Sequence, residues 1–594
     1  MARKKLAKDE DLSRRDALPE YVAGSKGGPW YTSHTYPTKV PPETIIPFIE
    51  ASTAPGGTVA DPFCGSGMTG VAALLTGRKA VLSDLSPGAV HLAQNHTRRV
   101  PPEALKDAVA KLDKGWMEKY ETTLYASSII DGPDGNPIEG IARHTIWSEV
   151  YACPACDKEN VLWEVAEAAD GPLPKQINCM YCTETFDRTR QTSIRSQPAN
   201  IAVKPNEGGK LQHGKPSVEA LETIEAIGRK RITKWVPGNP IDSTREMYIR
   251  SALHLRDVET VADMFAHRPS LALSRLWDEI SQIEDQPIRE ALEFAFTNTA
   301  WHASRMRRYN AHGGQRPLTG TLFIPQLISE PNVFEVFRHQ VRQVSRLYEV
   351  LPEGDVTAQQ SSATDLTGHI PDSSIDYVFT DPPFGNNIHY ADCNIVWESW
   401  LGEPTNNDEE IVVNKSRQVE HGGKTVDDYQ RLLTDAFAEC RRIVRPNGRV
   451  SIVFHNSDDA IWTALLDAVE GAGLHQAEVS ILDKGQRSQK GYKVRQGELV
   501  PFYDLVMTFT PDKRSVPELN GAGNTALSAV KDHLSQLDAG KASSKRNLDY
   551  LYSVAVSGVI RSGERPVGLS LRAFEELCNL ELDRVDDSFF LPIT

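Results

Sequence analysis

An apolar stretch that runs into a carboxylate and two prolines carries the most specific chemistry in the sequence. Residues 375–380 predict a buried strand, which leads directly into Asp381-Pro382-Pro383-Phe384. Two prolines fix two φ angles and donate no N–H, and ligands bind at the carboxyl ends of strands in α/β sheets. We expect an exocyclic amine to donate to Asp381 and to the Pro382 carbonyl while Phe384 stacks on its ring. Both hydrogen bonds would free the nitrogen lone pair of the amine for attack. The alternative interpretation of the motif is an incidental Asp-Pro-Pro turn.

A glycine turn between a predicted strand and a predicted helix is the second candidate site. Gly65 and Gly67 follow Asp61 and Phe63 there, and glycine lets a backbone approach a ligand closely. Asp84 ends the next predicted strand, where a Rossmann-like fold places an acid on a pair of ribose hydroxyls. The alternatives are a dinucleotide site, or a plain tight turn in which Asp84 caps a helix.

Two closely spaced cysteine pairs predict a metal site. The pairs are Cys153 with Cys156 and Cys179 with Cys182, and each can present two thiolates to one tetrahedral Zn²⁺. We therefore predict a structural zinc ribbon at residues 151–185, with four reduced buried thiols as the alternative. Four cysteine ligands leave no open position for catalysis, and disulfide frameworks are typical of small secreted chains.

Length and composition restrict the class of protein. The chain has 594 residues, 40% of them hydrophobic and 24% charged, with a net charge of −15. This length predicts several domains, and the acidic balance excludes a uniformly basic nucleic-acid coat but not a local basic groove. No apolar run approaches a membrane span, and the first 16 residues lack the apolar core of a secretory signal. We expect a cytoplasmic protein.

The elements that position these motifs predict an α/β fold. Strands at 58–61 and 80–83 alternate with helices at 68–76 and 89–99, a pattern that indicates a parallel sheet. Further strands are predicted at 376–380, 450–455 and 504–510, with a helix at 460–472.

The sheet signals are interrupted by a long insertion. Residues 30–100 and 350–511 together supply about 230 residues, which is a normal size for one split Rossmann-like domain. We expect residues 101–349 to be an inserted, mainly helical, zinc-containing module. Residues 1–29 are expected to be a flexible tail, and residues 512–594 a linker with a small helical C-terminal region.

Together the motifs resemble those of amino-methyltransferases that use S-adenosylmethionine to modify adenine N6 or cytosine N4 in DNA. Asp381–Phe384 resembles the catalytic DPPY/DPPF motif. Residues 59–70 are similar to the cofactor motif DPFxGSGTT, from which Met68 and Gly70 depart. The stretch His389-Tyr390-Ala391-Asp392 resembles part of the large bacterial adenine-specific DNA methylases.

The resemblance implies further cofactor contacts. Thr38 and Lys39 lie in a segment similar to one that contacts the cofactor before the glycine motif. Asp365 stands where the family carries an acid near the adenine of the cofactor. Together with Asp61, Phe63, Gly65, Gly67 and Asp84, these are the predicted cofactor-binding residues.

The motif order in this superfamily places target recognition in the gap between the two motifs, and basic residues in that gap are candidates for DNA contacts. One cluster there comprises Arg305, Arg307, Arg308 and Arg316 with Tyr309 beside them, and a separate stretch beyond the gap, in the predicted hairpin after residue 483, comprises Lys484, Arg487 and Lys490. A second cluster comprises Arg229, Lys230, Arg231 and Lys234. Solvated helix faces and an exposed hairpin are the alternatives.

The predicted reaction is methyl transfer to adenine N6 in a flipped-out base of double-stranded DNA. Restriction-modification or phage defence, with partner proteins, is an expectation from the resemblance. Cytosine N4 is the nearest alternative, although an acid at the first motif position favours adenine over cytosine-N4 enzymes, which more often carry serine. Guanine N2 in RNA and an inactive zinc-ribbon binding protein stay open. Cytosine C5 chemistry is excluded, because the one Cys-Pro pair, Cys153-Pro154, lies within a predicted zinc knuckle.

Overall fold

The structure is a computed structural model of the chain. It describes residues 17–25, 27–126, 128–131, 136–169, 173–310, 315–484, 503–512, 526–538 and 543–592. Among the helices in these ranges, none combines the length and the apolar character that crossing a membrane requires.

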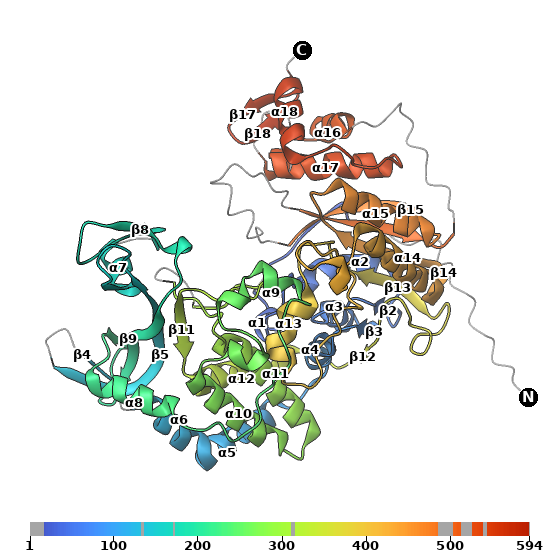
Figure 1. The fold of residues 1–594 in the computed structure, drawn as a ribbon. Coiled ribbons are helices and arrows are strands. Elements are labelled where there is room, and N and C mark those ends of the chain that lie inside the picture. The colour runs from blue at the N-terminus through green and yellow to red at the C-terminus, as the bar shows by residue number, and fades with distance from the viewer. Residues whose placement is uncertain are drawn as a thin grey trace, which may run out of the picture.

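An eight-stranded mixed sheet positions the predicted site (Figure 1), with the strand order β1-β15-β16-β14-β13-β2-β3-β12. The strands are β1 (Tyr21–Ala23), β2 (Thr58–Asp61), β3 (Lys79–Asp84), β12 (Val356–Gln360), β13 (Ile375–Thr380), β14 (Val444–Phe454), β15 (His475–Asp483) and β16 (Asp504–Thr510). β16 runs antiparallel to both of its neighbours, and the other neighbouring pairs are parallel.

The strand order reverses between β2 and β13. From β2 the chain continues to β3 on one side, whereas β13 pairs with β2 on the other. The glycine turn follows β2 and the Asp-Pro-Pro loop follows β13, so both predicted motifs leave adjacent strand ends. This is the position at which open α/β sheets bind ligands.

Helices with clear start signals flank these strands. α4 (Pro87–Thr97) begins with proline in its first turn, and the Ser86 hydroxyl accepts from the Ala89 N–H as an N-cap. α14 (Val426–Ile443) begins with a reciprocal capping box between Thr425 and Asp428. The remaining helices of this part are α2 (Pro42–Ser52), α3 (Met68–Leu75), α13 (Tyr390–Glu398) and α15 (Asp459–Gly471).

The insertion contains more helix than strand, but it also has a second sheet that the expectation of a mainly helical module did not include. Its second sheet has the order β10-β9-β5-β11, with β4 and β6 also paired to β5. The strands are β4 (Ser128–Asp131), β5 (Pro137–Ala152), β6 (Glu159–Val161), β9 (Arg195–Pro205), β10 (Gln212–Gly214) and β11 (Leu327–Pro331). Near its end β5 is buried on both faces and includes Thr145, Ser148 and Glu149. It therefore lacks the alternation that identifies a half-buried strand.

Helices of the insertion share a core with helices that flank the eight-stranded sheet. One hydrophobic cluster joins Leu92 of α4, Phe294 of α11 and Trp397 of α13. The helices of this layer are α5 (Pro102–Leu112), α6 (Glu118–Tyr125), α10 (His267–Ser281), α11 (Gln286–Ala303) and α12 (Val333–Val350). The insertion is thus packed against the part of the chain that holds the eight-stranded sheet.

Both ends of the described chain also join this sheet. β1 pairs in parallel with β15, and the Leu18 N–H donates to Glu478, so the structure contradicts a flexible tail reaching to residue 29. At the other end, Tyr550 of α17 shares a core with Val479 and Leu505. The C-terminal elements are α16 (Ala526–Ser535), α17 (Leu548–Arg561), α18 (Leu571–Glu581) and the hairpin β17 (Asp583–Val585) and β18 (Ser588–Phe590) (red in Figure 1).

Candidate active site and metal centre

A cavity at the carboxyl ends of β2, β3 and β13 gathers most of the predicted catalytic and cofactor residues. Its lining includes Thr38, Lys39, Asp61, Phe63, Gly65, Asp84, Asp381 and Pro383. Residues 405 and 409–411, from a loop after α13, complete the wall. Residues separated by more than 300 positions in the chain therefore face one space.

Asp61 fixes the two loops relative to each other. Its Oδ1 accepts from the Phe63 N–H at 3.1 Å and from the Thr380 hydroxyl at 2.7 Å, and its Oδ2 accepts from the Thr69 hydroxyl at 2.7 Å. Burial raises the pKa of Asp61 to about 7, against the lowering by the two hydroxyls. Because Thr380 directly precedes Asp381, this carboxylate links the glycine turn to the Asp-Pro-Pro loop.

Gly65 and Gly67 have different functions in the turn. Gly65 lines the cavity at a φ of +48°, and a Cβ there would lie 3.0 Å from the Tyr36 ring. Gly67, at a φ of +80°, is absent from the lining, and its Cβ would lie 2.6 Å from the Ala93 Cα. Gly67 therefore allows α3 to approach α4 closely, and its contact with a cofactor stays a prediction.

Asp84 ends β3 and lines the cavity. Its Oδ2 accepts from the Gly65 N–H at 2.8 Å and its Oδ1 from the Ser86 N–H at 3.0 Å. Burial raises the pKa of Asp84 to about 6, and these backbone N–H groups counteract that rise. Each oxygen keeps a lone pair for a hydroxyl donor from the cavity.

The segment before α2 contributes through Thr38 rather than through the Lys39 ammonium. The Thr38 hydroxyl lies 2.7 Å from the Tyr390 hydroxyl at the cavity wall. Lys39 also lines the cavity, but its Nζ donates to the carbonyls of Trp30 at 2.7 Å and His34 at 3.1 Å. Burial lowers the pKa of Lys39 to about 7. Its ammonium holds the segment together and is not directed to a ligand.

Asp365 lies away from the cavity. Its carboxylate is exposed and accepts from the Thr367 N–H at 3.1 Å and hydroxyl at 2.7 Å, so it forms a local turn. The cavity is instead lined by Ser362 and Ala363 of the same loop. The predicted loop is in place, but the predicted acid is not the residue that faces the ligand.

The Asp-Pro-Pro loop is held through two of its carbonyls. The Tyr429 hydroxyl donates to the Pro383 carbonyl at 2.6 Å, and the Asn456 amide donates to the Phe384 carbonyl at 3.1 Å. In the described part of the chain the Pro382 carbonyl has no donor. One accepting carbonyl beside Asp381 is thus left for a ligand.

Asp381 is paired with Lys484, which was predicted to contact nucleic acid. The Lys484 Nζ lies 3.1 Å from Asp381 Oδ2, 2.6 Å from Asp504 Oδ2 and 5.7 Å from the centre of the Phe384 ring. Its side chain is only 15% exposed. Two carboxylates bind this ammonium in the structure described, so the prediction that it contacts a phosphate is wrong there.

The basic group at 305–309 is partly internal. The Arg305 guanidinium donates to the carbonyls of Asp263 and Arg256, and burial lowers the pKa of Arg307 to about 10. Tyr309 packs edge-to-face on Trp163. Arg308, like Arg307, is half-buried, with its Nε atom inside. The predicted residues Arg487 and Lys490 lie outside the described residues.

Two aromatic side chains to which sequence reasoning assigned no role line the cavity, and an acid outside the lining holds its wall together. The rings of Tyr36 and Tyr390 stack at 5.9 Å between centroids and both line the wall. Glu398 accepts from the Ser86 hydroxyl at 2.5 Å and the Thr405 N–H at 2.9 Å. Glu398 thus ties the start of α4 to the loop over the cavity. The position of Tyr390, soon after the Asp-Pro-Pro loop, was the available signal.

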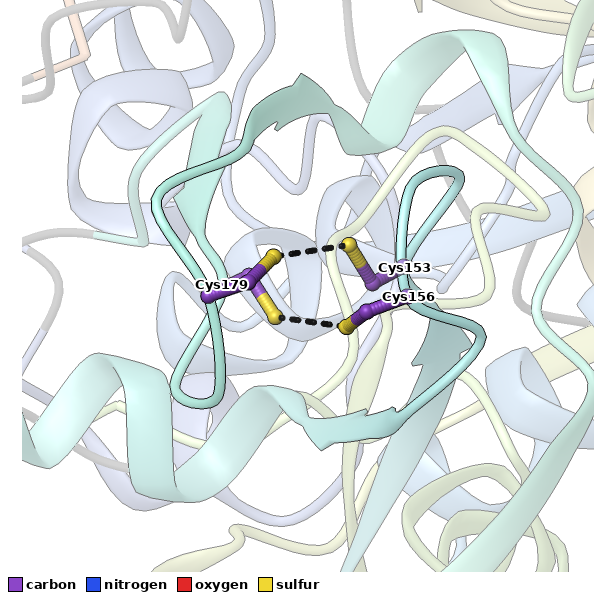
Figure 2. A group of neighbouring side chains, drawn as sticks. Cys153, Cys156 and Cys179 are labelled. Atoms are coloured by element: carbon purple, nitrogen blue, oxygen red, sulfur yellow. Dashed lines mark hydrogen bonds between the residues drawn. The ribbon is translucent and has the colours of Figure 1, made fainter.

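The four paired cysteines converge at one point (Figure 2). Their sulfur atoms all lie within 4.8 Å of one another, and the Sγ···Sγ distances are 3.7 Å for Cys153 to Cys182 and for Cys156 to Cys179. Tetrahedral Zn²⁺ with bonds of about 2.3 Å separates sulfurs by about 3.8 Å. The Tyr181 N–H donates to Cys179 Sγ at 3.4 Å, a contact that suits a thiolate. The residues present therefore fit the predicted zinc ion.

Two comparisons identify relatives of part of the chain. Residues 10–95 match a family model described as a DNA methylase of the N6/N4 type. A protein named "Putative methylase YubD" from Escherichia coli (strain K12) is 37% identical over 76 residues, which are 13% of this chain and 32% of that protein. The resemblance to amino-methyltransferases is thus confirmed. The family match includes the glycine turn and Asp84 but ends well before Asp381.

Solved structures give a weaker likeness. Geranyl diphosphate methyltransferase in complex with GPP and sinefungin is 11% identical, over 31% of this chain and 61% of that one, with a TM-score of 0.15. The enzyme from Streptomyces coelicolor A3(2), in complex with Mg²⁺, geranyl diphosphate and S-adenosyl-L-homocysteine, is 10% identical over 30% and 60%, with the same TM-score. TM-scores of this size support no argument. The chain spans less than two thirds of each of these relatives.

Proposed function

We propose that this protein transfers the methyl group of S-adenosylmethionine to the N6 amine of adenine in DNA. The observation that carries the proposal is a single cavity with Asp84 and Gly65 at one end and Asp381 at the other. The first end has the hydrogen-bonding groups for a ribose, and the second has those for an amine. The DNA methylase match supports DNA as the substrate class.

The residues at the first end fit the cofactor. Gly65 has no side chain to fill the space beside the turn, and the Asp84 oxygens retain lone pairs beside their backbone donors. Tyr36 and Phe63 add aromatic surface to the wall. When bound, S-adenosylmethionine would supply an electrophilic methyl group on a sulfonium.

The residues at the second end would hold the amine. An adenine must leave the duplex to reach this cavity. Asp381 would then accept one amine hydrogen and the Pro382 carbonyl the other, because that carbonyl has no donor among the described residues. Tyr429 and Asn456 hold the loop so that these acceptors are in place before the base arrives. Such preorganised acceptors favour transfer by positioning.

Other exocyclic amines are the alternatives that share this geometry. Cytosine N4 or guanine N2 would donate the same two hydrogen bonds, and the aspartate at the first motif position is the feature that favours adenine. Restriction or defence partners stay predictions, because no contact of the described residues addresses them.

A transfer assay tests the proposal directly. Labelled S-adenosylmethionine is supplied to the full chain with unmethylated duplex DNA and, separately, with total tRNA and rRNA, and the nucleosides are identified by mass spectrometry. We expect N6-methyladenine in DNA. N4-methylcytosine would overturn the base assignment, label confined to RNA would overturn the substrate class, and cofactor binding without transfer would favour the inactive binding protein.

We propose in addition that the cysteine cluster binds one structural Zn²⁺, which stabilises the fold of residues 151–185 in the insertion. Elemental analysis of the full chain should give one zinc per molecule. Cys153→Ser should lose that zinc, whereas Cys578→Ser, in the C-terminal core, should keep it. A wild-type protein that contains no zinc after growth with added zinc would contradict this site.

A further inference from the structure

The ammonium of Lys484 lies next to Asp381, and a second carboxylate, that of Asp504, lies next to the same ammonium. Lys484 follows β15 and Asp504 begins β16, and the two strands pair so that Leu482 lies opposite Asp504. This hairpin base places the Lys484 Nζ between Asp504 Oδ2, at 2.6 Å, and Asp381 Oδ2, at 3.1 Å. The ion pair therefore rests on strand geometry and not on a chance meeting of surface side chains.

All three side chains are largely removed from solvent. The exposed fractions are 15% for Lys484, 22% for Asp381 and 14% for Asp504. Charge pairs at such sites are screened less than surface pairs. The ammonium binds one Asp381 oxygen, and Oδ1 has no partner among the residues that the structure describes.

We propose that Lys484, held by Asp504, is a positioning residue that fixes the Asp381 carboxylate in its ionised form with Oδ1 left for the substrate amine. This inference rests on the proposed function, in which Asp381 accepts from the amine. Asp504 has a second effect, because its charge balances that of the ammonium. Methyl transfer moves positive charge onto the amine, and an unbalanced ammonium nearby would oppose it.

Several other titratable groups surround Asp381. Asp61 lies at the end of the neighbouring strand β2, and Tyr390 lies at the start of α13. His455 follows β14, and its Nδ1 lies 3.8 Å from Asp504 Oδ1 and 2.9 Å from the Tyr503 carbonyl. All three residues are kept in the variants, although Asp504→Asn removes the charge beside His455 and Lys484→Met removes the ammonium that acts on Tyr390.

The two partners act on the Asp381 carboxyl in opposite directions. Burial raises the pKa of Asp381 to about 6; Lys484 lowers it and Asp504 raises it further. Removing the ammonium should therefore raise this pKa, and removing the second carboxylate should lower it. An opposite charge at this distance typically changes a carboxyl pKa by about 1–3 units.

The test compares Lys484→Met and Asp504→Asn, which preserve side-chain size. The acidic limb of kcat/KM for DNA methylation, measured at saturating cofactor, reports the pKa of the free enzyme. We expect Lys484→Met to move that limb to higher pH by about 1 unit or more. We expect Asp504→Asn to move it to lower pH, and the double variant to return toward wild type.

A second measurement needs no methyl transfer. A water-soluble carbodiimide reacts with the protonated carboxyl, so labelling of Asp381 against pH, read by peptide mass spectrometry, follows the same titration. If the ion pair only stabilises the hairpin, both variants should have a lower melting temperature. The pH dependence of Asp381 labelling should then not differ between them. Unmoved labelling curves, or curves that move in the same direction, would overturn the inference. Wild-type protein that labels as expected but methylates no nucleic acid would overturn the proposed function alone.

Discussion

The two ends of the cavity hold their carboxylates by different chemistry. At the end formed by β2 and β3, Asp61 and Asp84 accept from backbone N–H groups and hydroxyls. At the end formed by β13 and β16, Asp381 is paired with an ammonium that a second carboxylate, Asp504, also holds. Neutral donors do not titrate near neutral pH, whereas three coupled ionisable groups respond to one another.

This difference suits the two proposed ligands. A cofactor that binds in every turnover needs a fixed cradle, and neutral hydrogen bonds from the backbone provide one. The amine of a base that enters and leaves needs a carboxylate acceptor. That carboxylate must keep its negative charge and leave one oxygen available to the amine. The comparison therefore assigns rigidity to one end and charge control to the other, and substitutions at each end should have separate effects.

The largest effect is expected from Asp381→Ala. Losing the amine acceptor should lower the methyl-transfer rate by about 10²–10³-fold, the cost of removing one preorganised hydrogen-bonding group in an active site. Cofactor affinity, measured by calorimetry, should be unchanged because Asp84 and the glycine turn are intact. Retention of more than about a tenth of the wild-type rate would contradict the role of Asp381.

Asp84→Ala should have the opposite effect: it should weaken cofactor binding and leave the acceptor of the amine intact. We expect cofactor affinity to fall by about 10–100-fold, since hydrogen bonds to charged groups contribute about 1.5–3 kcal/mol. Asp365→Ala is the matched control, because that carboxylate is exposed and, among the residues the structure describes, accepts hydrogen bonds from Thr367 alone. Equal calorimetric affinities for wild type and Asp84→Ala would refute the ribose contact. A loss in the Asp365→Ala control would return that acid to the site.

Local signals explain which parts could be predicted from the sequence. The strand Thr58–Asp61 was predicted with the bounds that the structure shows, because it leads into a turn that contains Gly65 and Gly67. Prolines and a buried strand marked the Asp381 loop in the same way. The position of a turn and the direction of the chain after it depend on residues close by in the sequence. The local sequence is therefore enough to predict them.

The functions of long polar side chains could not be predicted in this way. Lys39 was predicted to contact the cofactor and Lys484 to contact nucleic acid, but oxygen atoms of the protein hold each ammonium. Asp365 and Gly67 had the right residue type and the right loop, but their contacts depend on tertiary packing. Which atom a flexible side chain meets is decided by the fold, not by its neighbours in the chain.

The smallest expected effect tests the rigidity of the cofactor end. Gly67 and Gly77 both have positive φ, at +80° and +67°, so alanine at either costs about 1–2 kcal/mol of backbone strain. A Cβ at Gly67 would also meet the Ala93 backbone at 2.6 Å, whereas one at Gly77 would meet nothing within 4 Å. Overpacking typically adds about 1–3 kcal/mol.

Gly67→Ala should therefore lower the melting temperature more than Gly77→Ala does, as measured by calorimetry on the full chain. It should also weaken cofactor binding, because α3 and α4 would separate beneath the turn that presents Gly65 and Asp84. Gly77→Ala should leave affinity unchanged. If both variants lost equal stability and kept equal affinity, the close approach of the two helices would not control the cofactor end.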